Sequence, residues 1–238
     1  MILKDNILHE RLTQYGKHFH PVVEHDSLTD KIVKFDFSQN NTSLQNIDVA
    51  DTEIFCAYIN DLLYKADAKF GIGGYDELRN FYSRSSLFDD ANLKEEPRRL
   101  HLGIDIWGKA GTEIFAPLDG AIHSFAFNDN FGDYGATIIL KHELQNALFY
   151  TLYGHLSLAD LQTLKEGDII KKEQKFAHFG KPEENGHWPS HLHFQVIEDI
   201  GNFIGDYPGV CKYSEREKYL KNCPNPDLIL NMIQKAIK

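Results

Sequence analysis

The most restrictive feature of the sequence is a series of short strand-like segments between residues 97 and 200. In chain order these segments are LHLGIDIW, EIFAPLDGAIHSFAF, ATIILKHE, LFYTLYGHL, FAHFG and HLHFQVI. Most of them alternate apolar and polar residues or are rich in β-branched residues, and Gly, Pro, Asn and Asp separate them. The pattern predicts a compact β domain over 97–200.

The region before this domain has a helical pattern. Apolar residues recur at helical spacing within DTEIFCAYINDLLYKADAKF, namely Ile54, Tyr58, Leu62 and Leu63. The glycines of GIGGY then indicate a turn before a shorter helix, because glycine interrupts helices. These glycines lack the lysine and hydroxyl of a phosphate-binding loop. Residues 1–96 are therefore expected to form a mainly helical extension.

The region after the β domain, residues 201–238, is expected to be a tail that ends in a helix. Four apolar residues would let this helix pack on the core, namely Leu228, Leu230, Ile233 and Ile237. Together the three regions predict a mainly β chain, α+β overall.

Charge and hydropathy exclude several classes of partner. The chain has 238 residues and a formal net charge of −10 at pH 7, which would repel nucleic acid or an anionic membrane surface. No apolar stretch is long enough to insert into a membrane, and the first residues lack the apolar core of a secretory signal. The chain as given is therefore expected to be cytoplasmic. The pattern does not indicate an oligomeric state.

Two segments of the β region place potential metal ligands on shared faces. On one extended strand His101 and Asp105 would point to the same side, with Gly103 between them leaving room for a ligand. His191 and His193 share a face by the same period of two. Four side chains from two strands could therefore meet, and the spacing alone leaves open which of them bind a metal.

Zinc suits this set of side chains. It prefers imidazole and carboxylate ligands, and catalytic zinc sites use three protein ligands so that water can take the fourth position. Two histidines and one aspartate would leave a net positive charge, which acidifies that water. A second HxH in KHFHPVVEHD, formed by His18 and His20, is interpreted as surface structure. Six further histidines are interpreted as structural, namely His9, His25, His123, His142, His178 and His187.

The motifs HLGID, YGHLS and HLHF, in this order, resemble the signature of the lysostaphin-like (LytM-type) zinc metalloendopeptidases. That signature is HxxxD, then a histidine before Leu-Ser, then HxH. The intervening segments AGTEIFAPLDGAI and EGDIIKKEQKFAHFG are also typical of the family. The turns in these segments resemble those of duplicated-hybrid-motif folds, so the resemblance implies an antiparallel β-sandwich.

The resemblance also implies roles for five residues. His101, Asp105 and His193 would bind one zinc ion per chain, with His191 as the general base. His155 would bind the developing oxyanion or help to protonate the leaving amine. The implied reaction is hydrolysis of peptide bonds, with peptidoglycan or its fragments as the substrate.

Two other functions remain open. The same fold could serve as a non-catalytic scaffold that binds and regulates a partner, although such proteins usually lack some of the ligands. It could also be a phosphocarrier of the duplicated-hybrid type, in which two facing histidines pass a phosphoryl group. Asp105 as a ligand argues against that reaction.

Overall fold

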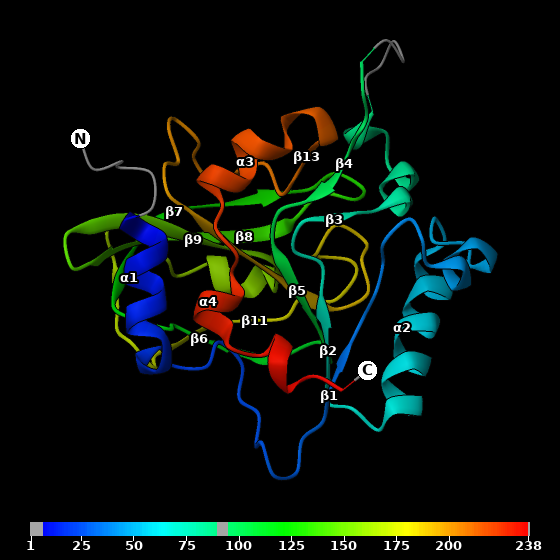
Figure 1. Cartoon of the computed structure of the whole chain (residues 1–238), viewed down its shortest axis with the longest axis horizontal. Helices are drawn as coiled ribbons and strands as arrows, with labels where there is room; N and C mark the ends of the chain where they lie inside the picture. Colours follow the sequence, from blue (N-terminus) through cyan, green and yellow to red (C-terminus); the bar gives the residue numbers. More distant parts are fainter. Residues whose placement is uncertain (1–6, 90–94, 238) are drawn as a thin grey trace.

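A computed structural model describes residues 7–89 and 95–237 of the chain, and its main element is a mixed eight-stranded sheet (Figure 1). The strand order is β1-β2-β5-β12-β9-β8-β7-β10. The strands are β1 (Ile32–Lys34), β2 (Phe70–Gly73), β5 (Ile104–Trp107), β7 (Gly120–Asn128), β8 (Gly135–Leu144), β9 (Ala147–Leu156), β10 (Ile169–Ile170) and β12 (His191–Ile197). The mainly β character predicted from the sequence is confirmed.

Two small sheets accompany the large one. One pairs β6 (Glu113–Phe115) with β11 (Lys175–His178), and the other has the order β13-β4-β3. The strands of the latter are β3 (Glu77–Leu78), β4 (Arg98–His101) and β13 (Val210–Lys212). The pairs formed among strands of the predicted β domain are antiparallel, as expected, and β1 pairs with β2 in parallel.

The helices are few and lie around the sheets. They are α1 (Ile7–Tyr15), α2 (Thr52–Ala66), α3 (Arg216–Asn222) and α4 (Asp227–Leu230). Short 3₁₀ turns lie at Gly16–His18, Thr42–Asn46, Asn80–Arg84, Ser86–Phe88, Leu158–Leu161, Tyr213–Glu215 and Ile233–Lys235. In Figure 1, α1 and α2 lie at opposite ends of the molecule. No helix within the described residues has the length and apolar character needed to cross a bilayer.

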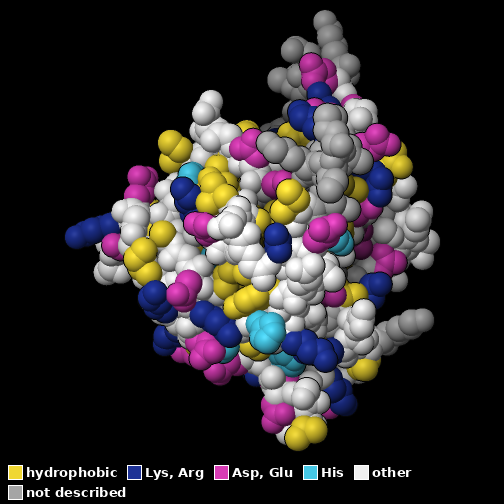
Figure 2. All heavy atoms as spheres, turned by 60° about the vertical axis from the view of Figure 1, so that its left-hand side comes forward, with side chains coloured by type: hydrophobic (Ala, Val, Ile, Leu, Met, Phe, Trp, Pro, Cys, Tyr) yellow, Lys and Arg dark blue, Asp and Glu magenta, His cyan; other side chains and the backbone are white. Residues whose placement is uncertain are grey.

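The surface near α1 carries charges of both signs. Figure 2, which brings this side of the molecule forward, shows Lys and Arg side chains interspersed with Asp and Glu side chains. Beneath that surface α1 buries Leu8 and Leu12 in the main core, where the helix contacts β9 and α4. The N-terminal helix is thus held by the apolar core of the sheet.

Helix α2 is confirmed, but its buried face differs from the predicted one. The Asp51 carboxylate accepts a hydrogen bond from Ile54 N and begins the helix, and Asp67 in a left-handed conformation ends it. Phe55 and Ile59 are buried, whereas Ile54 is 45% exposed. The buried face is rotated because Phe55 packs into a cluster of aromatic rings, which includes Phe37, Phe81, Trp107 and Trp188.

The expected turn between two helices at GIGGY is wrong, because Phe70–Gly73 forms strand β2 and the turn at Tyr75 and Asp76 leads into strand β3. Its glycines are needed for close packing: a Cβ on Gly71 would lie 2.2 Å from the Phe35 ring, and one on Gly73 would lie 2.5 Å from the Phe35 carbonyl oxygen. Strand β2 pairs with β5 and with β1. The N-terminal region therefore extends the large sheet directly beside β5.

The expected C-terminal helix is also shorter than predicted. Helix α4 ends where Asn231 adopts a left-handed conformation, and the Asp227 carboxylate accepts hydrogen bonds from the next two backbone amides. The chain then reaches β1, where Ile237 exchanges backbone hydrogen bonds of 2.8 Å with Ile32 and Lys34. The tail thus ends beside the first strand of the sheet.

Candidate metal centre

Three buried side chains from three strands converge at one point. His101 ends β4, Asp105 lies on β5 and His193 lies on β12, and each is at most 2% exposed. His193 Nδ1 lies 2.8 Å from His101 Nε2 and 3.2 Å from Asp105 Oδ1, and the latter two atoms are 3.3 Å apart. Within residues 7–89 and 95–237, this is the group of His, Cys, Asp and Glu side chains with metal-binding geometry.

The expectation that His101 and Asp105 share one strand is wrong. The chain leaves the small sheet after His101 and enters the large sheet at Ile104, so Leu102 and Gly103 connect two strands. A Cβ on Gly103 would lie 2.5 Å from His193 Cε1. Gly103 therefore makes room for the ring of His193. The sequence had indicated that it makes room for a bound molecule.

In each of the three side chains, the polar atom that points away from the other two has a hydrogen-bond partner. His101 Nδ1 donates to the Gly74 carbonyl at 2.8 Å, and His193 Nε2 donates to Gln195 Oε1 at 2.9 Å. Asp105 Oδ2 accepts a hydrogen bond of 2.6 Å from Arg79. These bonds leave one lone-pair atom of each side chain facing the other two. In a tetrahedral zinc site with bonds of about 2.0–2.1 Å, donor atoms are about 3.3–3.4 Å apart. The two distances to Asp105 Oδ1 are close to this value, and the distance of 2.8 Å between the two histidine nitrogens is shorter. The types of donor atom, two imidazole nitrogens and one carboxylate oxygen, fit zinc.

Sequence reasoning missed the three partners. Gln195 follows His193 by two positions, so the period of a strand was a signal that it lies on the same face. Arg79 and Gly74 gave no such signal, because their contacts with the ligands depend on the pairing of β3 with β4 and of β2 with β5.

The protonation states of His101 and Asp105 suit metal binding. Burial, and then the nearby Arg79 guanidinium, lower the pKa of His101 to about 3, so its ring is neutral. Burial alone would raise the pKa of Asp105, but His101 and Arg79 beside it hold that pKa well below its usual range. A neutral imidazole and an ionised carboxylate are the forms that bind a metal.

His155 and His191 lie next to the three converging residues. His191 Nδ1 donates to the Pro189 carbonyl at 2.7 Å, and its ring stacks on Trp107 with a centroid distance of 3.9 Å. His155, the last-but-one residue of β9, has a φ of 64° and donates from Nδ1 to the Asn185 carbonyl at 2.8 Å. The two ring centroids are 4.1 Å apart. Both rings therefore keep Nε2 free of hydrogen when neutral.

A comparison with protein families matches residues 99–203 to the model described as peptidase family M23. We call this matched region, residues 99–203, the M23 domain. The resemblance to lysostaphin-like enzymes that the motifs indicated is therefore confirmed, and the family is one of peptidases.

The M23 domain is similar to several solved structures. A zinc-containing peptidase from Vibrio cholerae is 27% identical over 41% of this chain and 27% of that one, with a TM-score of 0.34. Csd3 from Helicobacter pylori is 27% identical over 52% of this chain and 32% of that one, with a TM-score of 0.33. The catalytic domain of lysostaphin from Staphylococcus simulans is 19% identical over 68% and 97%, with a TM-score of 0.39.

The chain spans about a third or less of the length of the first two of these structures. No curated protein matches the sequence.

The M23 site opens into a cavity of about 130 Å³. All five histidine and aspartate side chains of the site line it. Its other walls include Tyr82, Arg98, Trp107, Tyr134, Trp188 and Asp206. The wall thus combines aromatic rings with a few charged groups, and part of it comes from the segment that precedes the M23 domain.

The remaining HxH lies away from this site. His18 is exposed in a 3₁₀ turn, and His20 Nδ1 donates to the carbonyl of Pro21. The interpretation of this segment as surface structure agrees with these positions.

His142 is a buried histidine that is expected to make the free energy of unfolding depend on pH. It is 1% exposed and bonds the Asp119 carbonyl and Thr151 Oγ1, so its interpretation as structural agrees with its contacts. Burial lowers its pKa from 6.5 to about 4. The unfolded chain therefore binds a proton below pH 6.5 that the folded chain does not, and the free energy of unfolding falls as the pH falls.

We expect His142 to account for a loss of about 2 kcal/mol between pH 7 and pH 5. Urea denaturation of the chelator-treated chain at both pH values measures the total loss. In His142→Gln the loss should be smaller by that amount. An equal loss in both proteins would show that His142 does not resist protonation.

Proposed function

We propose that the chain is a zinc metalloendopeptidase that hydrolyses peptide bonds in peptidoglycan-derived peptides. The observation that carries the proposal is the convergence of one free donor atom each from His101, Asp105 and His193. Two neutral histidines lie beside this point, in a domain of a peptidase family. Metal ligands and proton carriers are thus next to each other, as hydrolysis requires.

Zinc would be held by His101 Nε2, Asp105 Oδ1 and His193 Nδ1, because the other polar atoms of these side chains are engaged elsewhere. When bound, zinc supplies a Lewis acid that lowers the pKa of a water molecule to about 7. Three protein ligands would leave a fourth coordination position for that water.

His191 is assigned the role of general base. Its Nδ1 hydrogen is held by the Pro189 carbonyl, so Nε2 is the atom that accepts a proton. Burial lowers the pKa of His191 to about 4, which keeps the ring neutral at neutral pH. Nε2 lies 3.9 Å from Asp105 Oδ1, and the carboxylate stabilises the imidazolium that forms.

His155 is assigned to protonation of the leaving amine. Its neutral ring carries hydrogen on Nδ1, which the Asn185 carbonyl accepts, so Nε2 has no hydrogen to offer an oxyanion. The ring becomes a donor only after it takes a proton, and His191 lies beside it as a source. Of the two roles that the resemblance implies, proton delivery is therefore the better supported.

Incubation of the zinc-loaded chain with muropeptides and glycine-rich peptides, followed by mass spectrometry, tests the proposal. We expect new peptide termini to appear, and a chelator to prevent their formation. A non-catalytic scaffold would bind such peptides without cleaving them. Zinc-loaded protein that cleaves neither class would contradict the proposed function.

A further inference from the structure

The segment from Gly74 to Arg79 precedes the M23 domain and borders two of the candidate metal ligands. Strand β3 pairs with β4 so that Glu77 lies opposite His101, and β2 pairs with β5 so that Gly73 lies opposite Asp105. The loop between β2 and β3 is tied to the same place, because Asp76 N donates to the His101 carbonyl at 3.0 Å.

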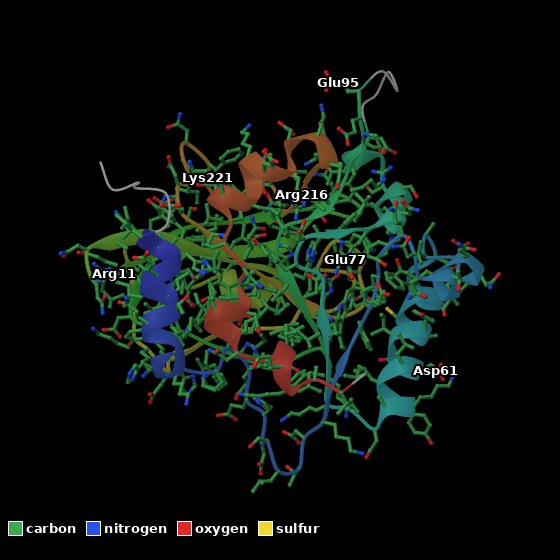
Figure 3. All side chains as sticks on the ribbon, viewed as in Figure 1. Arg11, Asp61, Glu77, Glu95, Arg216 and Lys221 are labelled. Carbon is green, nitrogen blue, oxygen red and sulfur yellow. The ribbon has the colours of Figure 1, made fainter. Side chains whose placement is uncertain are left out.

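Arg79 is the charged side chain of this segment that faces the ligands. It is 1% exposed, and it donates to Asp105 Oδ2 and to Glu77 Oε2, in each case at 2.6 Å. Its guanidinium also packs against the rings of Phe81 and Tyr82. The Glu77 side chain is only 14% exposed, whereas Figure 3 shows Asp61 on the outer side of α2. A buried arginine held by two carboxylates has a fixed position.

Gly74 completes the arrangement through its lack of a side chain. A Cβ at this position would lie 1.9 Å from an Arg79 guanidinium nitrogen and 2.8 Å from His101 Nδ1. Its φ of 109° is also one that other residues rarely adopt. The Gly74 carbonyl accepts the Nδ1 hydrogen of His101. The same residue therefore orients one ligand and leaves space for the arginine that contacts another.

We propose that Arg79 is a positioning residue of the metal centre, which makes the segment from Gly74 to Arg79 a permanent part of that centre. This inference rests on the proposed zinc site. By holding Asp105 Oδ2, Arg79 leaves Oδ1 as the single oxygen for the metal. The N-terminal region is thus needed to build the site, and is not a removable cover over it.

The zinc dissociation constant of the full chain, measured by competition with a chelating dye, tests the inference. We expect Arg79→Met to weaken zinc binding by about 10–100-fold, the range found when the hydrogen-bond partners of metal ligands are removed. Arg79→Lys should fall between Arg79→Met and the natural chain, because it restores the charge without the planar guanidinium.

The matched control is Arg216→Met. Arg216 forms an ion pair with Asp76 in the same loop but contacts none of the metal ligands. Its loss should leave the zinc dissociation constant close to that of the natural chain. A second readout is the visible spectrum of the cobalt-loaded chain, which should change in Arg79→Met because Asp105 Oδ2 becomes free to bind. A purely structural role of Arg79 would leave that spectrum unchanged.

If Arg79→Met alone fails to fold, the double variant Glu77→Gln with Arg79→Met is measured in its place. It removes the charges of both Glu77 and Arg79. Zinc affinity and cobalt spectrum equal to those of the natural chain, in either folded variant, would overturn the inference. An equal loss of affinity in Arg216→Met would also overturn it. A natural chain that binds zinc with the expected dependence on Arg79, yet cleaves no peptide, would contradict only the proposed function.

Discussion

Replacing His191 with alanine is expected to lower kcat for peptide hydrolysis by at least about 100-fold while zinc stays bound. The reason is that His191 Nε2 is the proposed proton acceptor, whereas none of the three donor atoms of the candidate metal centre belongs to His191. The measurement is kcat for a cleaved peptide, together with zinc content by mass spectrometry.

His178→Ala is the matched control for this experiment. His178 is a half-buried histidine that pairs with Asp160, and it is not among the residues that line the cavity. Its replacement should leave kcat near that of the natural chain. Unchanged turnover in His191→Ala would remove His191 from its assigned role, and loss of zinc would show that it belongs to the metal centre instead.

Replacing Asp105 with alanine is expected to abolish stoichiometric zinc binding and to destabilise the fold by about 3–5 kcal/mol. The destabilisation arises because Arg79, at 1% exposure, loses one of its two carboxylate partners. Zinc content and urea denaturation of the metal-free protein measure the two effects separately.

A double replacement separates the ion pair from the metal site. In Arg79→Met with Asp105→Leu neither member of this ion pair remains, and Glu77, which loses Arg79, keeps its hydrogen bond from Phe37 N. Much of the stability should therefore return while zinc binding stays lost. If the double variant were as unstable as Asp105→Ala, the unpaired arginine would not be the cause. If Asp105→Ala kept one zinc per chain, Asp105 would not be a ligand.

The sequence predicted the parts of this protein that depend on local pattern. Alternating or β-branched residues, bounded by Gly, Pro, Asn and Asp, identified strands β7, β8, β9 and β12. The strand period of two placed His191 and His193 on one face. The motifs then led to the five side chains that the structure brings together around the cavity.

The parts that the sequence did not predict depend on contacts between distant segments. Gly71 and Gly73 of β2 mark the close approach of Phe35, and Gly74 after β2 marks that of Arg79, although glycine in sequence equally indicates a turn. His101 and Asp105 belong to two sheets because Leu102 pairs with Gly209, more than one hundred positions away. The periodicity of a single segment contains no information on such pairings. The sequence therefore did not predict that Arg79 and Gly74 lie beside the candidate metal ligands.

Titration of the chelator-treated chain with zinc, while peptide hydrolysis is followed, tests the central claim most directly. The claim is that His101, Asp105 and His193 hold one zinc ion that hydrolysis requires. Activity should be absent without metal, rise in proportion to added zinc and stop rising at one equivalent per chain. Hydrolysis that persists without metal, or that does not respond to zinc, would contradict the account.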